Sequence, residues 1–104
     1  MIINFEQYYE EYNEKVLAGR PEGKEYRAHL DLDNIDKTSD VVEVIIPEYF
    51  FSLNSSFFLG CFGPSVRNLG EKSFREKYVF TCDSALKKGI EDGISRALNE
   101  SVIQ

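Results

Sequence analysis

The stretch that decides the fold runs from residue 45 to residue 63: Ile45-Ile46-Pro47-Glu48-Tyr49-Phe50-Phe51-Ser52-Leu53-Asn54-Ser55-Ser56-Phe57-Phe58-Leu59-Gly60-Cys61-Phe62-Gly63. It continues a β-branched apolar run over 41–46, which is typical of a central strand covered on both faces. Pro47 should end this strand, because proline cannot donate to a sheet ladder. Polar residues follow at 54–56 and suit a helix start, so the pattern predicts a buried strand, a loop and a helix over 55–70.

Periodic segments lie on both sides of this stretch. Apolar residues at helical spacing predict an amphipathic helix over 5–17, and apolar steps of four predict a closing helix over about 84–99. Strict alternation over 26–32 and an apolar run over 78–82 predict two further strands. Helices are therefore expected to flank a small sheet.

The size of the chain fits a single core. It has 104 residues, of which 42% are hydrophobic, and this is enough for one domain but not for two. We therefore predict an α/β domain over 1–104, with about three to four strands. Its parts are an N-terminal amphipathic helix within 1–20 and a core over 24–104.

The net charge of −6 is unevenly distributed. Residues 1–54 carry twelve acidic and five basic side chains, net −7, whereas residues 55–104 carry six acidic and seven basic, net +1. Because a phosphate backbone is bound through Lys and Arg, this balance argues against nucleic acid as a partner. A local basic cluster is interpreted as a solvated turn between helix and strand, with an anion or partner contact as the alternative: Arg67, Lys72, Arg75 and Lys77.

Targeting signals and cysteine chemistry are not indicated. The chain has no run of the roughly 18 to 20 apolar residues that a bilayer helix needs, and its N-terminus turns acidic at Glu6. A cytoplasmic protein without membrane contact is therefore expected. Cys61 and Cys82 lie inside apolar runs, which favours buried thiols over a disulfide or a reactive site.

The sequence shows no catalytic or metal-binding pattern. Acidic residues crowd 31–36, but the order does not fit a calcium loop, since the required glycine is missing. His29 is the only histidine and has no recognisable triad partner. We therefore expect a protein that is not an enzyme and that uses no metal or cofactor.

Small residues form a row on the closing helix. Gly89, Gly93 and Ala97 are four apart, beside the Leu and Ile stripe. A glycine inside a helix costs on the order of 1 kcal/mol relative to alanine, so the row predicts close backbone approach. The neighbour is expected to be the domain's own sheet, or else a partner helix.

Two serines stand at the predicted helix start after the loop. Ser55 and Ser56 occupy the place where the first backbone N–H groups of the helix point outward. A phosphoryl group there would add a charge of about −1.5 to −2 and change the surface offered to a partner. The ordinary alternative is that Asn54 or Ser55 only caps the helix.

This region resembles a STAS-like family of uncharacterised bacterial proteins. The resemblance covers roughly residues 20–100. In the anti-sigma-factor antagonists, which are better-known relatives, the same turn reads Asp-Ser-Ser-Gly-Leu-Gly. A partner kinase with a histidine-kinase-type ATPase fold phosphorylates the first serine there and switches binding off. The matching residues of this chain are Ser55, Ser56, Phe57, Phe62, Gly63, Val66 and Arg67, with Tyr26 and Arg27 upstream.

Three positions depart from that pattern. Asn54 replaces the aspartate, Phe57 replaces the glycine, and Pro64 interrupts the expected helix. The resemblance still implies a regulatory protein-binding module with Ser55 or Ser56 as phosphoacceptor and an ATPase of this type as partner. The residues it implies as partner contacts are Asn54, Phe57, Arg67, Tyr26 and Arg27.

A second function remains open from the sequence. The acidic first half and the tyrosine-rich first helix also suit a constitutive interaction or inhibitor protein of a mobile-element or defence system. Such a protein would not depend on phosphorylation. Charge reversal at Glu10 and Glu14 should then weaken binding more than substitution of Ser55.

Overall fold

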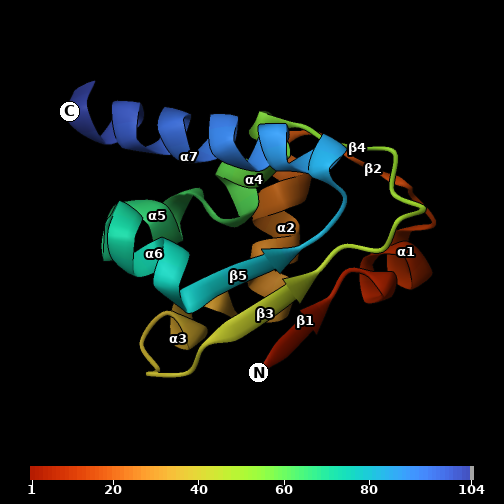
Figure 1. Cartoon of the computed structure of the whole chain (residues 1–104), viewed down its shortest axis with the longest axis horizontal. Helices are drawn as coiled ribbons and strands as arrows, with labels where there is room; N and C mark the ends of the chain where they lie inside the picture. The colour runs from red at the N-terminus through yellow and green to blue at the C-terminus, as the bar shows by residue number, and fades with distance from the viewer. Residues whose placement is uncertain (104) are drawn as a thin grey trace.

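Helices and short strands alternate along the chain (Figure 1). The computed structural model describes the backbone of residues 1–103 and the side chains of residues 1–100. Within this part there are seven α-helices and five strands, and the α/β prediction is confirmed. The elements are β1 (Ile2–Asn4), α1 (Glu6–Tyr12), β2 (Val16–Leu17), α2 (Arg20–Leu30), α3 (Leu32–Ile35), β3 (Val42–Ile45), β4 (Ser52–Leu53), α4 (Ser55–Cys61), α5 (Gly63–Leu69), α6 (Glu71–Lys77), β5 (Tyr78–Thr81) and α7 (Ser84–Ile103).

The strands form two parallel sheets in the described chain. The larger sheet has the order β1-β3-β5, and its register places Ile2 beside Glu43 and Glu43 beside Val79. The smaller sheet pairs β2 with β4, so that Leu17 lies opposite Leu53. Parallel pairing needs long crossovers, and here each crossover carries helices. The prediction of three to four strands is therefore slightly low.

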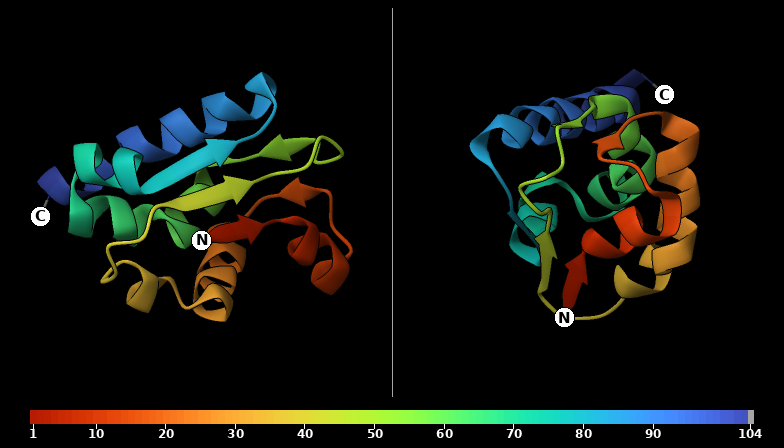
Figure 2. Two further views of the ribbon diagram at one scale, coloured as in Figure 1. Left: turned by 60° about the horizontal axis from the view of Figure 1, so that its bottom comes forward. Right: turned by 90° about the vertical axis from the view of Figure 1, so that its right-hand side faces the viewer.

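The helices cover one face of the larger sheet. Both crossovers, from β1 to β3 and from β3 to β5, run in the same direction, and this places their helices on the same side. Alternate residues such as Val42, Val44 and Tyr78 are buried against them. In the right-hand view of Figure 2 the three strands lie at the lower left and α2 lies at the right. The prediction that the central strand is covered on both faces is wrong.

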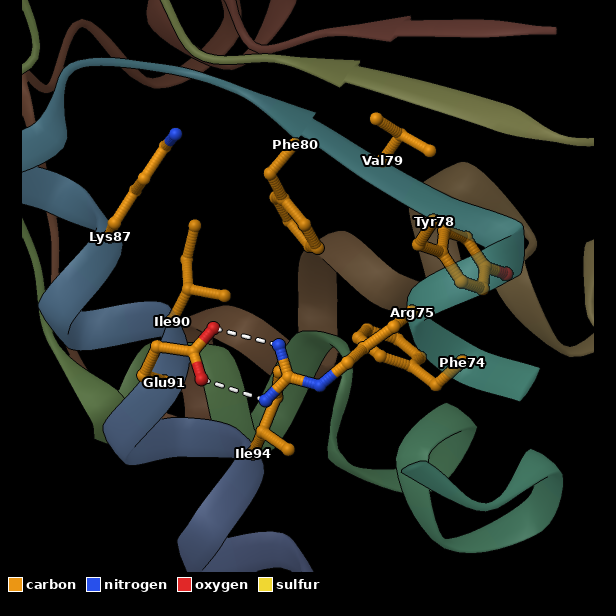
Figure 3. Close-up of a pocket in the computed structure, with 9 residues that line it drawn as sticks. All are labelled: Phe74, Arg75, Tyr78, Val79, Phe80, Lys87, Ile90, Glu91 and Ile94. Atoms are coloured by element: carbon orange, nitrogen blue, oxygen red, sulfur yellow. Dashed lines mark hydrogen bonds and ion pairs between the residues drawn. The ribbon is translucent and has the colours of Figure 1, made fainter. Parts of the chain in front are cut away.

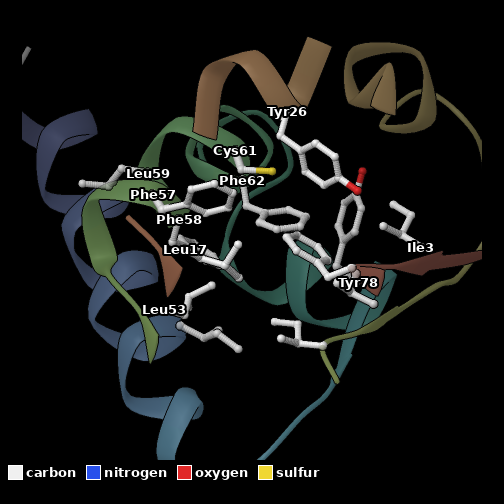
Figure 4. Packing of buried hydrophobic residues seen from close by; sticks show 14 of the residues in the cluster. Ile3, Leu17, Tyr26, Leu53, Phe57, Phe58, Leu59, Cys61, Phe62 and Tyr78 are labelled. Atoms are coloured by element: carbon white, nitrogen blue, oxygen red, sulfur yellow. The ribbon is translucent and has the colours of Figure 1, made fainter. Parts of the chain in front are cut away.

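Aromatic side chains fill the space between the sheet and the helices (Figure 4). One group surrounds Phe5, whose ring lies 5.2 Å from Tyr26 between centroids, and a second surrounds Phe74, 5.1 Å from Tyr78. Edge-to-face and offset contacts of this kind add to the burial of apolar area. The largest fully buried side chains are Tyr26, Tyr78, Phe5, Phe57, Phe58, Phe62, Phe74, Leu17, Leu32, Leu59, Val42 and Val44.

Two glycines let α2 and α4 touch backbone to backbone. A Cβ added at Gly23 would overlap the carbonyl oxygen of Phe57, and one added at Gly60 would overlap that of Arg20. Because a methyl group at either position would push the helices apart, both positions require glycine. This contact fixes α4 against the longest internal helix and so positions the turn that precedes it.

Several sequence predictions about the first half are wrong. The helix expected over 5–17 ends at Tyr12, because Asn13 adopts a left-handed conformation with φ 54° and the chain continues into β2. The strand expected over 26–32 is helix α2, followed by the short α3. An N-terminal strand, β1, precedes α1 where none was expected.

Predictions about the second half hold better. Strand β3 ends before Pro47, β5 covers most of 78–82, and α7 begins at Ser84 as expected but extends beyond residue 99. The helix expected over 55–70 is divided, because Pro64 occupies the first turn of α5. The basic segment between Gly70 and β5 is helix α6 and not a turn.

Both cysteines are free thiols in the apolar interior or at its edge, as predicted. Cys61 is buried and Cys82 half-buried, and burial raises the pKa of the Cys61 thiol. Among the described residues, no helix combines the length and apolar composition needed to cross a bilayer.

Candidate functional site

The two predicted serines lie beside a surface hollow of about 510 Å³ between the start of α4 and the first turns of α7. Asn54, Ser55 and Ser56 form the α4 side of this hollow, and Lys88 and Asp92 form part of the α7 side. The remaining lining residues are Phe51, Ser52, Leu53, Ala85 and Gly89. We call this feature the serine hollow.

Backbone contacts hold the α4 side of the serine hollow in place. The Asn54 N–H donates to the Leu17 carbonyl at 2.8 Å, which extends the β2–β4 ladder by one step. Asn54 itself is extended, with φ −83° and ψ 147°, and its carbonyl accepts the first α4 bond from Phe58 at 3.1 Å. The turn is therefore fixed on its strand side and on its helix side.

The α7 side is held by the row of small residues. A Cβ at Gly89 would overlap the carbonyl oxygen of Leu53, and one at Gly93 would overlap the ring of Phe58. Ala97 is fully buried. The row therefore lets α7 approach β4 and α4, and the close contact is made within the domain.

Ser55 interacts with a cation from α7. Its Oγ accepts a hydrogen bond from Nη1 of Arg96 at 2.7 Å. Ser55 and Ser56 are both half-buried, and Arg96 is exposed. With Lys88 and Asp92 on the same wall, the immediate surroundings of Ser55 carry two cations and one anion. Arg96 lies 41 positions from Ser55, and no local sequence pattern singles it out.

The residues implied as partner contacts separate into surface and interior positions. Asn54 is exposed on the serine hollow. Phe57 is fully buried, with its ring 5.6 Å from that of Tyr8, so it offers no surface to a partner. Tyr26 and Arg27 are buried on α2, and Arg67 is half-buried on α5. The structure thus brings together Asn54, Ser55 and Ser56 but not the other four.

Arg27 is the centre of a buried polar cluster. Its Nη1 donates to the Cys61 carbonyl and to Ser65 Oγ, each at 2.8 Å. Its Nη2 donates to Asp33 at 2.8 Å and to Asp36 at 3.0 Å. These bonds tie α2 to α3, α4 and α5 and use two of the three aspartates in 31–36.

The same cluster reaches the sheet through Tyr78. The Tyr78 hydroxyl donates to Asp36 Oδ1, and Ser65 Oγ donates to Oδ2 of the same carboxylate at 2.7 Å. Burial, and then the bond to Asp36, raise the pKa of Tyr78, because both favour the neutral phenol. Arg27, Ser65, Tyr78 and the Asp36 carboxylate are buried and hydrogen-bonded to one another, whereas Asp33 lies at the solvent edge with its side chain 81% exposed. A buried group of polar side chains bonded in this way is typical of a structural network.

Two of the three basic residues of α6 are engaged within the domain. Lys77 is buried, and its Nζ donates to the carbonyls of Thr38 at 2.7 Å and Asp40 at 2.8 Å. Arg75 forms two hydrogen bonds with Glu91, at 2.7 and 2.8 Å. Lys72 is exposed. These side chains therefore do not form one continuous anion site.

A second cavity, of about 240 Å³, lies between β5, α6 and α7 (Figure 3). Phe80, Ile90 and Ile94 form its apolar walls, and the Arg75–Glu91 pair spans it. These two charged groups satisfy each other. The cavity thus presents mainly apolar surface and no arrangement for acid–base or nucleophilic chemistry among its lining residues.

Comparison of the chain with models of protein families, with curated proteins and with solved structures gives no match. The residue pattern and the geometry of the serine hollow are therefore the features that bear on the function of this chain.

Proposed function

We propose that this chain is a STAS-like regulatory protein-binding module that works in the cytoplasm without catalysis or a cofactor. Its partner surface is the serine hollow. Phosphorylation of Ser55 by a partner with a histidine-kinase-type ATPase fold controls that surface. The observation that carries the proposal is the hydrogen bond of 2.7 Å from Arg96 to Ser55 Oγ at the edge of the hollow.

Charge explains how such a switch would work. The surroundings of the unmodified Ser55 have a net charge of +1, because Lys88 and Arg96 are cationic and Asp92 is anionic. A phosphoryl group adds about −1.5 to −2 and reverses this sign. A partner that contacts the unmodified surface through acidic groups would then be repelled.

Two departures from the antagonist pattern leave the hollow open. Phe57 points into the core, where it packs beside Phe5 and Tyr8. Pro64 lies in the first turn of α5, beyond the end of α4. Neither residue lines the serine hollow, so both are compatible with access to Ser55.

The proposal is tested by recovering the tagged protein from its native cells and measuring its intact mass. A co-purifying ATPase and a fraction of the chain heavier by one phosphoryl group are expected, and fragment analysis should place that group on Ser55. A chain that stays unmodified under all growth conditions would contradict phosphoregulation.

Substitutions sharpen the test once the partner is in hand. Ser55→Asp should weaken binding by about tenfold or more, which corresponds to about 1.4 kcal/mol. Ser73→Asp is the matched control, since Ser73 is an exposed serine on α6, outside the hollow. Equal effects of the two substitutions would mean that added negative charge acts from a distance and not at the hollow.

A constitutive acidic binder is the alternative function. It is favoured by the exposure of Glu10 and Glu14, which lie on and just after α1. Reversing both charges, Glu10→Lys with Glu14→Lys, should then abolish binding while Ser55→Asp leaves it intact. The opposite result supports the serine switch.

A further inference from the structure

The larger sheet has an open face, turned away from the helices. In Figure 1 its strands lie in front of α2. We define the open face by the outward-pointing residues of β1, β3 and β5, which alternate with buried ones: Ile2, Asn4, Glu43, Ile45, Val79 and Thr81. Ile2 is 64% exposed and Val79 46% exposed, so apolar side chains on both outer strands face solvent.

An open face is unusual for a sheet of this kind. Parallel sheets occur almost only with both faces covered, because their crossovers supply helices. Here α2, α4, α5 and α7 pack on one another, and α4 reaches the opposite face through Phe58, whose ring lies 6.1 Å from that of Phe80 on β5. Ile2 and Val79 keep a large part of their surface exposed, although Val79 also lines the cavity between β5, α6 and α7.

A carboxylate stands in the middle of the open face. Glu43 lies on the central strand, and the register places Ile2 on one side of it and Val79 on the other. Its Oε2 accepts a hydrogen bond from Thr81 Oγ1 at 3.0 Å. Among residues 1–100, whose side chains the structure describes, no cationic side chain forms an ion pair with Glu43. The defined face thus carries three apolar side chains, two neutral polar ones and a single carboxylate, which stands between Ile2 and Val79.

We propose that the open face binds an amphipathic helix of a partner protein, with a lysine or arginine in the middle of its apolar side. A helix is the element that normally completes a parallel sheet. The apolar side of that helix would cover Ile2, Ile45 and Val79, and the cation would pair with Glu43. This proposal is independent of the serine hollow, which α4, β4 and α7 form.

Self-association through the same face is disfavoured by its charge. Two copies stacked about a two-fold axis through the central strand would bring the two Glu43 carboxylates together. Like charges buried at an interface without a cation are costly. The complementary surface must therefore come from a chain that supplies a positive charge.

The test uses two designed helical peptides of about 18 residues, or five turns. They share an apolar face of leucine and isoleucine and differ only in a central Lys or Glu. Amide shifts of the isotope-labelled whole chain report where each peptide binds. We expect shifts in β1, β3 and β5, with the Lys peptide binding on the order of tenfold more tightly.

Variants of the chain make the test specific. Glu43→Gln should reduce the tenfold preference for the Lys peptide to within about twofold. Val79→Asp should abolish binding, whereas the matched change Val16→Asp, at an exposed valine on β2, should leave it unchanged.

Three results would overturn the proposal. The shifts could map to the acidic α1 surface instead of the sheet, or the two peptides could bind equally well. Sedimentation could also show that the unmodified chain self-associates and that Val79→Asp, but not Val16→Asp, dissociates it. That result would assign the open face to a second copy.

Discussion

Two arginines of this domain each bridge two carboxylates, and they differ in burial. Arg27 pairs with Asp33 and Asp36, and its side chain is 8% exposed. Arg75 pairs with Glu71 and Glu91, and its side chain is 41% exposed. The Arg27–Asp36 pair is therefore shielded from water on both sides, whereas Asp33, at 81% exposed, and both partners of Arg75 face solvent.

Burial determines which of the two clusters the fold depends on. Inside the protein, a charge that loses its partner is left in a medium that solvates it poorly, so removing one member is costly. At the surface, water and salt replace a lost partner at little cost. Arg27 also donates to a carbonyl and a hydroxyl, whereas the hydrogen bonds of Arg75 within the described chain all reach exposed carboxylates. We therefore expect Arg27 to hold the fold together and Arg75 to be dispensable.

The largest predicted effect is that of Arg27→Met. The substitution keeps much of the apolar stem and leaves the Asp36 carboxylate, whose side chain is 8% exposed, without its cation. The free energy of unfolding should fall by about 3–5 kcal/mol. Urea denaturation followed by circular dichroism at neutral pH measures this loss. A loss below about 1 kcal/mol, the level of a surface pair, would erase the distinction between the clusters.

A double variant serves as the control. Asp36→Asn in the Arg27→Met background removes the uncompensated charge, so it should restore part of the lost stability. If the losses of stability in the two single variants simply add in the double variant, Arg27 and Asp36 act separately and no ion pair is involved.

Tyr78→Phe should have an intermediate effect. It removes the hydroxyl that donates to Asp36, and a lost hydrogen bond to a buried group costs about 1–3 kcal/mol. The raised pKa of Tyr78 means that the folded state favours the neutral phenol. The contribution of the neutral Tyr78 phenol to the free energy of unfolding is complete below the ordinary tyrosine pKa of about 10. It is lost as pH rises through the higher pKa of the folded state.

The measurement compares unfolding of the native chain and of Tyr78→Phe at about pH 8 and about pH 11. The stability gap between them should narrow at the higher pH, because only the native chain has this phenol to ionise on unfolding. Tyr8, with its pKa raised by burial to about 12, is present in both chains and cancels. A constant gap would contradict the role of the Tyr78 proton.

Arg75→Met should cost less than about 1 kcal/mol. The native chain should also lose this small contribution as salt is raised from about 0.05 to 0.5 M, because the Debye length falls. Unfolding of the two chains at both salt concentrations tests this. A salt-independent loss as large as that of Arg27→Met would show that the surface cluster is structurally essential.

The smallest predicted effect concerns acid. The hydrogen bond from Arg75 lowers the pKa of Glu91 below its ordinary value. The stability that the Arg75–Glu91 interaction contributes is present above the ordinary pKa of a glutamate. It is lost as pH falls through the lower pKa of Glu91 in the folded state. Carboxyl titration by NMR should show the pKa of Glu91 returning toward its ordinary value in Arg75→Met. An unchanged titration would remove Arg75 as the cause.

The buried cluster also shows why the first half was hard to predict. Over 26–32 the alternation predicts a strand, but Tyr26 and Leu30 are also one helical turn apart. Ala28, which a strand would place on the same face as Tyr26, is exposed. A charged residue such as Arg27 is rarely buried, so its place in the interior depends on partners far along the chain. Local periodicity does not contain this information.

The second half follows more closely from local pattern. The β-branched strand before Pro47 and the Leu and Ile steps of α7 were recognised because their periodicity agrees with their packing. The position of Ser55 and Ser56 at the start of a helix was predicted for the same reason, since a strand-loop-helix turn is a local feature. Arg96 was missed because its hydrogen bond to Ser55 depends on how α7 crosses α4.

The parallel ladders have a consequence for how the chain folds. Strand β1 pairs with β3 at a separation of about 40 residues, and β2 pairs with β4 at a similar one. None of these strands can form as a local hairpin, so each must wait until a long loop has closed. We expect the chain to assemble first around the glycine contact of α2 with α4 and to add its N-terminal strands late. During synthesis, β1 and β2 would leave the ribosome well before the strands with which they pair.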